Sequence, residues 1–296
     1  MSADGPTLGF IGAGRVGTAL SLKLEEAGYH VAAVYDRNQV AAGVLAGSLQ
    51  SCSPVSTAQD AAEGNNLIFI TTTDDQIGPA CDSVVWNRAQ SVVHCSGAAS
   101  TDVLDSAARQ GARVGSFHPC QAFADTAQAL RNIPGSTFAI EAEPPLAPIL
   151  EGMAEAMDCE HFRLAPGDKA LYHAAAVFVS NYAVTLLKVG ADLFSGMGIS
   201  KDRAVRILMP LIRGNVVNME QAGLPACLTG PIARGDSDTI KKHIETLLER
   251  FPAYLDLYAG LGLHTVPIAV QHESISDEVS ESLVNILKKG LDQSRR

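Results

Sequence analysis

The 296-residue sequence has few of the features that mark nucleic-acid-binding, zinc-binding or disulfide-stabilised proteins. Its 22 lysines and arginines are outnumbered by 32 acidic residues and form no basic stripe, which argues against a protein that binds nucleic acid through its phosphates. Its six cysteines are scattered, without a C-x-x-C pair or a histidine at zinc-ligand spacing. We therefore expect reduced thiols, no bound metal and no nucleic-acid partner.

The sequence also lacks a segment that would direct it to a membrane. The opening residues, MSADGPT, have neither the positive nor the apolar region of a signal peptide. The longest apolar stretch, residues 174–187, contains Ser180 and Asn181 and is shorter than the roughly 20 apolar residues that span a bilayer. We interpret this stretch as a buried helix and expect a cytoplasmic protein without a membrane partner.

The order of the apolar runs indicates two domains. From LGFIG at residue 8 to HFRL at residue 161, short β-type runs alternate with helical segments, which predicts βαβ units and a mainly parallel sheet. Beyond them, long helices are expected at residues 168–196, 200–223, 236–250, 252–262 and 276–289, with Pro210 kinking or splitting its helix. The prediction is an α/β domain at residues 1–165 and an all-helical domain at residues 166–296.

A glycine-rich turn follows the first predicted strand. In GFIGAGRVG, Gly12, Gly14 and Gly17 stand in G-x-G-x-x-G register between that strand and an amphipathic helix. The first glycine permits a tight turn, the second lets the backbone approach a diphosphate, and the third lets the helix pack closely on the strand. The N–H groups at the helix start, near Arg15 and Val16, would hold the phosphates. The motif predicts a Rossmann domain that binds a nicotinamide dinucleotide; the alternative is a glycine-rich turn without a ligand.

Two residues at the end of the second predicted strand bear on the choice of dinucleotide. Asp36 follows Gly12 by 24 residues, where a carboxylate can bind the adenosine ribose of NAD. Arg37 comes next, and a guanidinium at this place can pair with the 2′-phosphate of NADP. We favour NADP(H) as the cofactor and keep NAD as the alternative.

The next two strand ends are expected to border the nicotinamide half of the cofactor. Ligands of open α/β sheets bind beyond the carboxyl ends of the strands. Thr72, Thr73 and Asp74 follow one strand, and Ser96 and Gly97 follow the next. The alternative for these residues is helix capping, for which threonine, serine and aspartate are well suited.

Four polar residues are candidates for the chemical step. His118, before Pro119, ends a third strand at the same edge of the sheet and has a side chain suited to proton transfer. Lys169 and His173 are four residues apart on the first long helix of the second domain and share a face; Asn181 lies further along. The alternative is that hydrogen bonds to the protein itself satisfy these groups.

A loop in the second domain, LPACLTGPIARGDSDT, contains Thr229 and Arg234 just before a predicted helix. Such a loop suits either an anion site or a capped helix start. We take Thr229 and Arg234 as candidates for binding an anionic group of a substrate.

Taken in order, the motifs GFIGAGRVG, HCSGA, SFHPCQAF, LYHAAAVFVSNY and LTGPIARGD resemble the family that pairs a Rossmann-like domain with domain of unknown function 2520. The resemblance covers nearly the whole chain. It implies an NADP oxidoreductase related to 6-phosphogluconate dehydrogenase, β-hydroxyacid dehydrogenases, pyrroline-5-carboxylate reductase, ketopantoate reductase and prephenate dehydrogenase. It also implies a helical domain of the 6-phosphogluconate dehydrogenase C-terminal type, and it defines the fold more closely than the substrate.

Two details depart from these relatives. β-Hydroxyacid dehydrogenases have a lysine and, four residues later, an asparagine facing the nicotinamide, whereas here Lys169 is followed at that spacing by His173. His118 and Pro119 resemble the His-Pro pair of prephenate dehydrogenases, but the rest of that substrate signature is not evident. Neither mechanism is carried over to this chain.

These features together predict an NADP(H)-dependent oxidoreductase that transfers a hydride to or from a small carbonyl, hydroxy or imine compound bearing a carboxylate. In this hypothesis His118, Lys169 or His173 handles the proton, and the cofactor handles the hydride. The alternative is a sensor or regulatory module that binds the dinucleotide without turnover. The apolar helices of the second domain further predict a homodimer formed through that domain.

Overall fold

The computed structural model describes residues 5–123 and 125–295. Two compact units make up the chain, Met1–Ser180 and Asn181–Arg296. The first holds a sheet with helices, and the second is helical, so the α/β domain and the helical region expected from the sequence are confirmed. The domain boundary expected at residue 165 stays a prediction, because packing units and sequence domains need not divide at the same residue.

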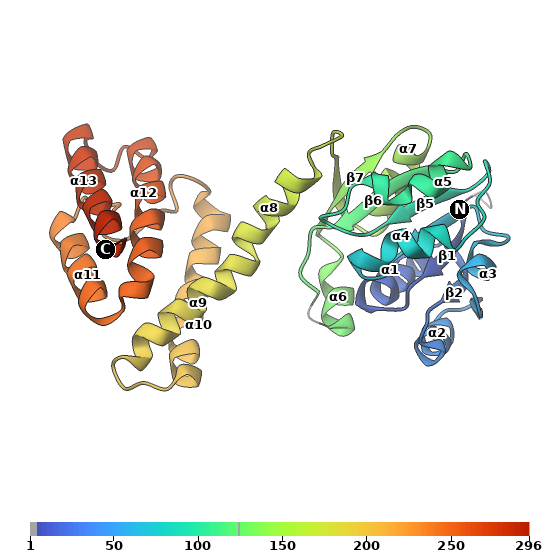
Figure 1. The fold of residues 1–296 in the computed structure, drawn as a ribbon, viewed down its shortest axis with the longest axis horizontal. Helices are drawn as coiled ribbons and strands as arrows, with labels where there is room; N and C mark the ends of the chain where they lie inside the picture. Colours follow the sequence, from blue (N-terminus) through green and yellow to red (C-terminus); the bar gives the residue numbers. More distant parts are fainter. Residues whose placement is uncertain (1–4, 124, 296) are drawn as a thin grey trace. The chain divides into compact units, whose positions relative to one another are not determined.

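An eight-stranded sheet organises the first unit (Figure 1). The strand order is β3-β2-β1-β4-β5-β6-β7-β8, and all neighbours are parallel except β6 and β7. Every strand predicted from an apolar run is present; the two-residue β3 was not predicted, since it has no such run. The strands are β1 (Thr7–Ile11), β2 (His30–Tyr35), β3 (Ser53–Pro54), β4 (Leu67–Ile70), β5 (Ser91–His94), β6 (Arg113–Pro119), β7 (Thr137–Ala142) and β8 (Glu160–Arg163).

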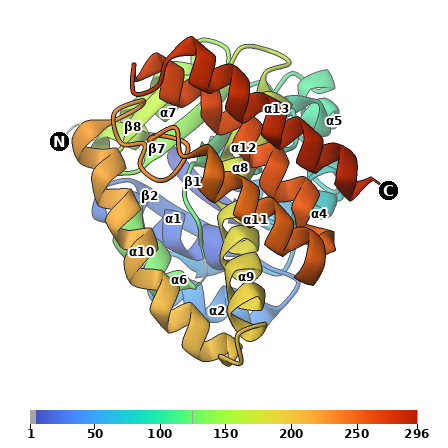
Figure 2. The same cartoon turned by 90° about the vertical axis from the view of Figure 1, so that its left-hand side faces the viewer.

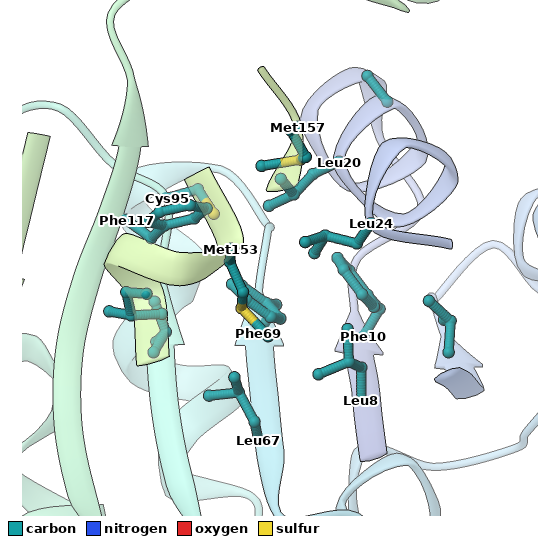
Figure 3. Close-up of a cluster of buried hydrophobic side chains, with 14 of the residues drawn as sticks. Leu8, Phe10, Leu20, Leu24, Leu67, Phe69, Cys95, Phe117, Met153 and Met157 are labelled. Carbon is teal, nitrogen blue, oxygen red and sulfur yellow. The ribbon is translucent and has the colours of Figure 1, made fainter. Parts of the chain in front are cut away.

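Helices cover both faces of this sheet, which explains why central strands such as LIFI are apolar at every position. One core includes residues of α1 (Arg15–Glu26), α2 (Gln39–Ala46), α6 (Thr126–Asn132) and α7 (Leu146–Ala156). The other includes residues of α3 (Ala58–Ala62), α4 (Asp74–Asp82), η1 (Thr101–Leu104) and α5 (Asp105–Arg109). Figure 3 shows the first core, where Phe10 stacks on Phe69 at 5.0 Å between ring centroids, beside Leu24 of α1 and Met153 of α7.

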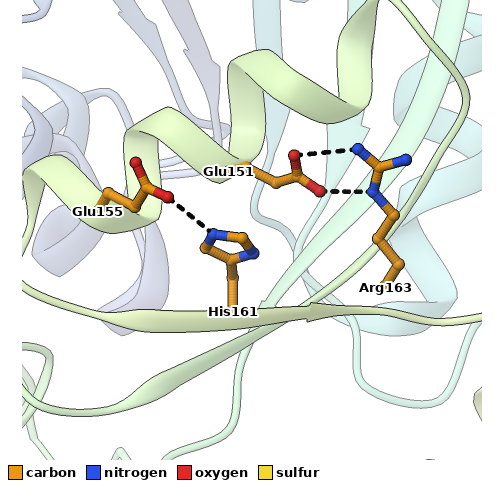
Figure 4. A network of polar contacts seen from close by, with 4 residues as sticks. All are labelled: Glu151, Glu155, His161 and Arg163. Carbon is orange, nitrogen blue, oxygen red and sulfur yellow. Dashed lines mark hydrogen bonds and ion pairs between the residues drawn. The ribbon is translucent and has the colours of Figure 1, made fainter.

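Charged residues tie the edge strand β8 to α7 (Figure 4). The Arg163 guanidinium pairs with both carboxylate oxygens of Glu151, at 2.5 and 3.0 Å. His161 lies 3.1 Å from Glu155. Because each pair has one exposed partner, Arg163 or Glu155, it adds at most about 1 kcal/mol to stability.

The second unit contains two groups of helices (Figure 2). Helices α11 (Ser237–Arg250), α12 (Leu255–Gln271) and α13 (Asp277–Ser294) pack around a core that includes Ile244, Leu255 and Leu287. Helices α9 (Asn181–Ser195) and α10 (Lys201–Ala222) lie side by side, and η2 (Pro252–Tyr254) precedes α12.

Three predicted helices differ from those observed. The predicted helix 168–196 is divided at Ser180 into α8 (Lys169–Val179), which belongs to the first unit, and α9. Helix α10 runs without a break through Pro210. Helix α12 continues past its expected end at Gly262. A side chain at this position would lie 2.6 Å from Leu287, so Gly262 serves close packing of α12 on α13 and does not end the helix.

The apolar stretch 174–187 is exposed in this chain, so the prediction of a buried helix is wrong. Phe178 is 68% exposed and Val184 is 69% exposed. Residues Lys169–Ser195, counted as one helix, are long and apolar enough to cross a membrane by length and composition alone. A single helix that meets those two criteria does not establish a membrane protein. An apolar sequence predicts a helix surface that is covered by other apolar groups, but it does not show whether those groups belong to the same chain or to a partner.

Candidate functional site

The glycine-rich turn links β1 to α1. Gly12 has a φ of +118°, and a Cβ there would lie 2.8 Å from the Thr71 backbone. A Cβ on Gly17 would lie 2.2 Å from the Gly12 carbonyl oxygen. Both positions therefore require glycine. Gly14 is different, because no heavy atom of the described residues lies within 4 Å of the place where its Cβ would be, so open space faces the first turn of α1.

A cavity of about 630 Å³ lies over this turn, next to the carboxyl ends of β1, β2 and β4. The strand order reverses between β1 and β4, which is where open α/β sheets bind ligands. Half of the lining residues were predicted from the sequence: Gly12, Gly14, Arg15, Val16, Asp36, Arg37, Thr72 and Thr73. Gly17, Asp74, Ser96 and Gly97 do not line this cavity.

Sequence reasoning missed the α4 wall of the cavity. Gln76, Pro79, Ala80 and Ser83 line it from α4 and the residue that follows. Their spacing of three, four and seven residues from Gln76 is a helix-face signal that the sequence carries. Tyr35 and Ala58 line it from the end of β2 and the start of α3.

Backbone N–H groups engage both oxygens of the Asp36 carboxylate. Oδ2 accepts from the Ala13 N–H at 2.7 Å, and Oδ1 accepts from the Asn38 N–H at 2.8 Å. Asp36 thus fastens the glycine-rich turn to the start of α2. Arg37 lines the cavity with an exposed side chain and donates to the Gln76 Oε1 at 3.1 Å. The Arg37 guanidinium is therefore a cation at the rim of the cavity. The neighbouring Asp36 carboxylate already accepts hydrogen bonds from two backbone donors.

The residues that follow β4 have mixed surroundings. Thr73 is the N-cap residue of α4, and its hydroxyl donates to Asp75 at 2.6 Å, which lowers the pKa of that carboxyl. Asp74 is exposed in the first turn of α4. The buried Thr72 Oγ1 has no hydrogen-bond partner among the described residues, and Thr72 lines the cavity.

A row of buried polar side chains crosses three neighbouring strands. His94 of β5 pairs with Ser116 of β6, which pairs in turn with Glu141 of β7, and none is more than 8% exposed. Lys169, the first residue of α8, donates from Nζ to the Ser116 Oγ at 2.5 Å and is 3% exposed. Sequence reasoning missed these three strand residues, although a polar residue inside an apolar strand was a visible signal.

Burial and mutual charge set the pKa values in this row. Burial lowers the Lys169 pKa, and the Glu141 carboxylate opposes that change. Burial likewise raises the Glu141 pKa, and Lys169 opposes it. Burial, followed by Lys169, lowers the pKa of His94 to about 3. Lys169 is thus the basic residue of a row of polar side chains that have little contact with water.

Two histidines meet at the Gly97 backbone. A Cβ on Gly97 would lie 2.7 Å from His118 Nε2 and 3.0 Å from His173 Nδ1. His118 Nδ1 lies 2.6 Å from the Tyr172 hydroxyl, and His173 Nδ1 has no hydrogen-bond partner among the described residues. Burial, followed by the charges of Lys169 and His173, lowers the pKa of His118 to about 4. The structure thus gathers His118, Lys169 and His173 with Gly97.

Ser96 and the predicted residues of the second unit have other surroundings. The Ser96 Oγ accepts from the Ala98 and Ala99 N–H groups, so Ser96 stabilises a turn. Asn181 begins α9 and is exposed, as are Thr229 and Arg234 in the loop before α11. That loop ends in a capped helix start, with Asp236 accepting from the Thr239 N–H at 3.0 Å. The functional roles of Asn181, Thr229 and Arg234 stay predictions.

The described residues contain no group of three metal-ligating side chains, and the six cysteines are free thiols.

Residues 4–119 match the Rossmann-like domain family, and residues 136–265 match domain of unknown function 2520. The chain pairs these two domain families. The resemblance stated from the motifs is thereby confirmed, and the two matches lie on either side of residues 120–135. No curated protein sequence matches the chain.

Several solved structures are similar in fold to this chain. A Bacteroides fragilis protein provisionally named an NADP oxidoreductase is 21% identical, with a TM-score of 0.67, over 90% of this chain and 100% of that one. A Streptococcus pyogenes 1-pyrroline-5-carboxylate reductase is 14% identical, with a TM-score of 0.58, over 97% and 99%. An Aspergillus terreus reductive aminase in complex with NADPH and ethyl-5-oxohexanoate is 14% identical, with a TM-score of 0.59, over 98% and 94%. At these identities the likeness shows the fold alone.

Proposed function

We propose that the protein is a cytoplasmic, NADP(H)-dependent oxidoreductase acting on a small carbonyl, hydroxy or imine compound that bears a carboxylate. The observation that carries the proposal is the cavity of about 630 Å³ over the first turn of α1, with Gly14 open to it and Arg37 at its rim. The solved structures of similar fold include enzymes named as a pyrroline-5-carboxylate reductase and as an NADPH-bound reductive aminase, which supports the same class of activity.

The surroundings of Asp36 and Arg37 favour NADP(H) over NAD(H). A ribose hydroxyl would have to share the Asp36 carboxylate with two backbone donors at 2.7 and 2.8 Å. The Arg37 guanidinium has an amide oxygen as its observed acceptor and can exchange that acceptor for a 2′-phosphate, a stronger one. The cavity residues therefore fit a phosphorylated adenosine.

The residues present fit the rest of the dinucleotide as well. Gly14 leaves room for a diphosphate at the N-terminus of α1, where the positive end of the helix dipole favours anions. The buried Thr72 hydroxyl, which has no partner among the described residues, is available to a polar group within the cavity. When bound, the nicotinamide ring supplies or accepts the hydride.

The chain's own residues would bind and orient the substrate near Gly97. His118 and His173 place ring nitrogens there, and Lys169 lies in the same cluster. The buried surroundings of these groups strengthen any hydrogen bond they make to a substrate. Thr229 and Arg234 remain predictions for the substrate carboxylate.

The test is nucleotide preference in Arg37→Ala. Loss of one charge-assisted phosphate contact costs about 1.5–3 kcal/mol, so the Kd for NADPH should rise roughly 10- to 100-fold. The Kd for NADH should change little, because NADH has no 2′-phosphate. Arg109→Ala, on the surface of α5 and outside the cavity, is the matched control.

Equal losses for both nucleotides would assign the site to NAD(H). Absence of binding and of thermal stabilisation by either nucleotide in the wild type would refute the proposal. Turnover of small oxo acids or imines with NADPH separates an enzyme from a sensor that only binds the nucleotide.

We further propose that the second unit forms a homodimer. Helices α9 and α10 expose large apolar side chains on a single chain, and a second copy of the same chain can cover such a surface in a two-fold dimer. The exposed residues are Tyr182, Val184, Leu186, Ile207, Leu211, Ile212, Val216, Val217 and Met219.

Light scattering after size exclusion tests this proposal. The wild type should have twice the 31.1 kDa mass of one chain. Leu211→Glu, which adds a charge to the exposed α10 surface, should shift it toward the monomer. Val85→Glu, an equally apolar exposed position in the first unit, is the control. A monomeric wild type at micromolar concentration would refute the homodimer.

A further inference from the structure

Two aromatic side chains, one from β6 and one from α8, form a close polar contact. The Tyr172 hydroxyl lies 2.6 Å from His118 Nδ1, and the rings meet edge to face with centroids 5.6 Å apart. The other ring nitrogen of His118, Nε2, is the atom nearest to the point where a Gly97 side chain would begin. The His118 imidazole therefore lies between the Tyr172 hydroxyl and the Gly97 backbone.

We propose that Tyr172 is a positioning residue that holds His118 in the tautomer with its single proton on Nε2, so that His118 donates a hydrogen bond to a substrate acceptor beside Gly97. The inference rests on the proposed function and deepens it. It assigns His118 to recognition of a carbonyl oxygen or imine nitrogen and adds Tyr172, which sequence reasoning overlooked.

The direction of the Tyr172 hydrogen bond follows from its length and from the chemistry of the two groups. Hydroxyl donors make bonds of about 2.5–3.0 Å, whereas N–H donors to oxygen need about 2.7–3.2 Å. The observed 2.6 Å fits a hydroxyl donor. A phenol is also a better donor than a neutral imidazole, and an imidazole nitrogen is a better acceptor than a phenol oxygen. Tyr172 thus donates to Nδ1.

The charge states agree with that direction. Burial raises the pKa of Tyr172, so the hydroxyl keeps its proton at neutral pH. The pKa of His118 is lowered to about 4, so its ring carries one proton at neutral pH. When Nδ1 accepts from Tyr172, that proton is on Nε2.

A neutral imidazole in this state acts by polarising an acceptor and keeps its own proton. Releasing the Nε2 proton would leave an imidazolate anion, which burial disfavours. Neutral histidine donors that polarise carbonyl groups are an established catalytic pattern. The proton that completes a reduction must then come from another group, for which Lys169, with its lowered pKa, is placed in the same cluster.

The experiment is nitrogen-15 NMR of histidine-labelled full-length protein at pH 7, which distinguishes the two neutral tautomers and the cation. His118→Gln identifies the His118 signals among the eight histidines. We expect a protonated Nε2 and an unprotonated Nδ1 in the wild type. In Tyr172→Phe, which keeps the ring contacts with His118 and Phe162, we expect a mixture of tautomers.

The chain provides a matched control. His243 and Tyr258 form a similar pair in the second unit, with Nδ1 and the hydroxyl 2.8 Å apart and the rings edge to face. Tyr258→Phe should leave the His118 signals unchanged. A wild-type His118 that is cationic or protonated on Nδ1 would overturn the proposal, as would an unchanged tautomer in Tyr172→Phe. If Tyr172→Phe does not fold, the wild-type spectrum alone decides the tautomer.

A kinetic measurement adds a second arm. With an active substrate, Tyr172→Phe should lower kcat/KM about 3- to 10-fold, the worth of one hydrogen bond of roughly 0.5–1.5 kcal/mol. The Kd for NADPH should stay the same, because Tyr172 does not line the cavity. The tautomer can be measured without nucleotide or turnover, so failure of the proposed function and failure of this inference are distinguishable.

Discussion

Gly14 and Gly17 belong to the same turn, yet the structure predicts opposite effects for alanine at these two positions. At Gly17 the new methyl group would lie 2.2 Å from the Gly12 carbonyl oxygen and 2.5 Å from the Thr71 hydroxyl. At Gly14 it would have no atom of residues 5–123 or 125–295 within 4 Å, and the φ of -73° is ordinary for alanine. We expect Gly17→Ala to damage the fold and Gly14→Ala to damage nucleotide binding.

The magnitudes separate the two variants. Overpacking against fixed backbone costs about 1–3 kcal/mol, so Gly17→Ala should melt roughly 2–12 °C lower, at about 2–4 °C per kcal/mol for a domain of this size. At Gly14, alanine loses about 0.5–1 kcal/mol as a helix N-cap and regains about 0.4–1 kcal/mol through a less flexible unfolded chain. These terms nearly cancel, so its melting temperature should stay within about 4 °C of wild type.

Two measurements on each variant test this contrast. Thermal melts without nucleotide report folding, and fluorescence titration with NADPH reports binding. Gly14→Ala should fold normally and lose about 100-fold or more in affinity, since a methyl group occupies the space in front of the helix N-terminus. Wild-type affinity in Gly14→Ala would refute the placement of the diphosphate. A melt of Gly17→Ala equal to wild type would refute the packing argument.

Two further predictions concern stability. Lys169→Met removes the donor to the buried Ser116 hydroxyl at a cost of about 1–3 kcal/mol, so the melting temperature should fall. The melting temperature should recover in the double variant Lys169→Met/Ser116→Ala. A double variant as unstable as Lys169→Met would contradict this account. In the second unit, hydrogen bonds from Lys188, then Lys201 and Tyr254, hold the Asp192 pKa below its usual value. The ionised Asp192 carboxylate therefore stabilises the fold above its unfolded pKa of about 4. This stabilisation is lost as pH falls. Asp192→Asn should therefore melt lower than wild type at pH 7, and the difference should shrink in melts below about pH 4; a difference that is constant with pH would count against the role of the charge.

The strands and the glycine-rich turn were predictable because local rules determine them. Apolar runs such as LIFI and SVVH fill a sheet covered on both faces, and the three glycines mark a turn that only glycine can form at Gly12 and Gly17. Helix ends were less predictable. Gly262 reads as a helix end, yet it lies within α12, because packing against Leu287 outweighs the low helix propensity of glycine.

The polar row across β5, β6 and β7 was beyond reach because it depends on strand register. His94, Ser116 and Glu141 are far apart in the sequence and become neighbours only when three strands align. One residue of slip in any strand would turn its polar side chain to the other face of the sheet. A single sequence does not report that register, and so the partner of Lys169 could not be named.

Tyr172 shows a different limit. Lys169, Tyr172 and His173 occupy positions i, i+3 and i+4 of α8, which share one helix face. Sequence reasoning selected the two ionisable residues and passed over the tyrosine, because an aromatic residue on an apolar helix is typical of a core position. In the structure the Tyr172 ring meets the exposed Phe162 ring edge to face, with centroids 5.7 Å apart, while its hydroxyl contacts His118. The ring of an amphipathic side chain can therefore pack against apolar neighbours while its hydroxyl makes a hydrogen bond to a nearby histidine. For that reason Tyr172→Phe, which removes only the hydroxyl, isolates the second role from the first.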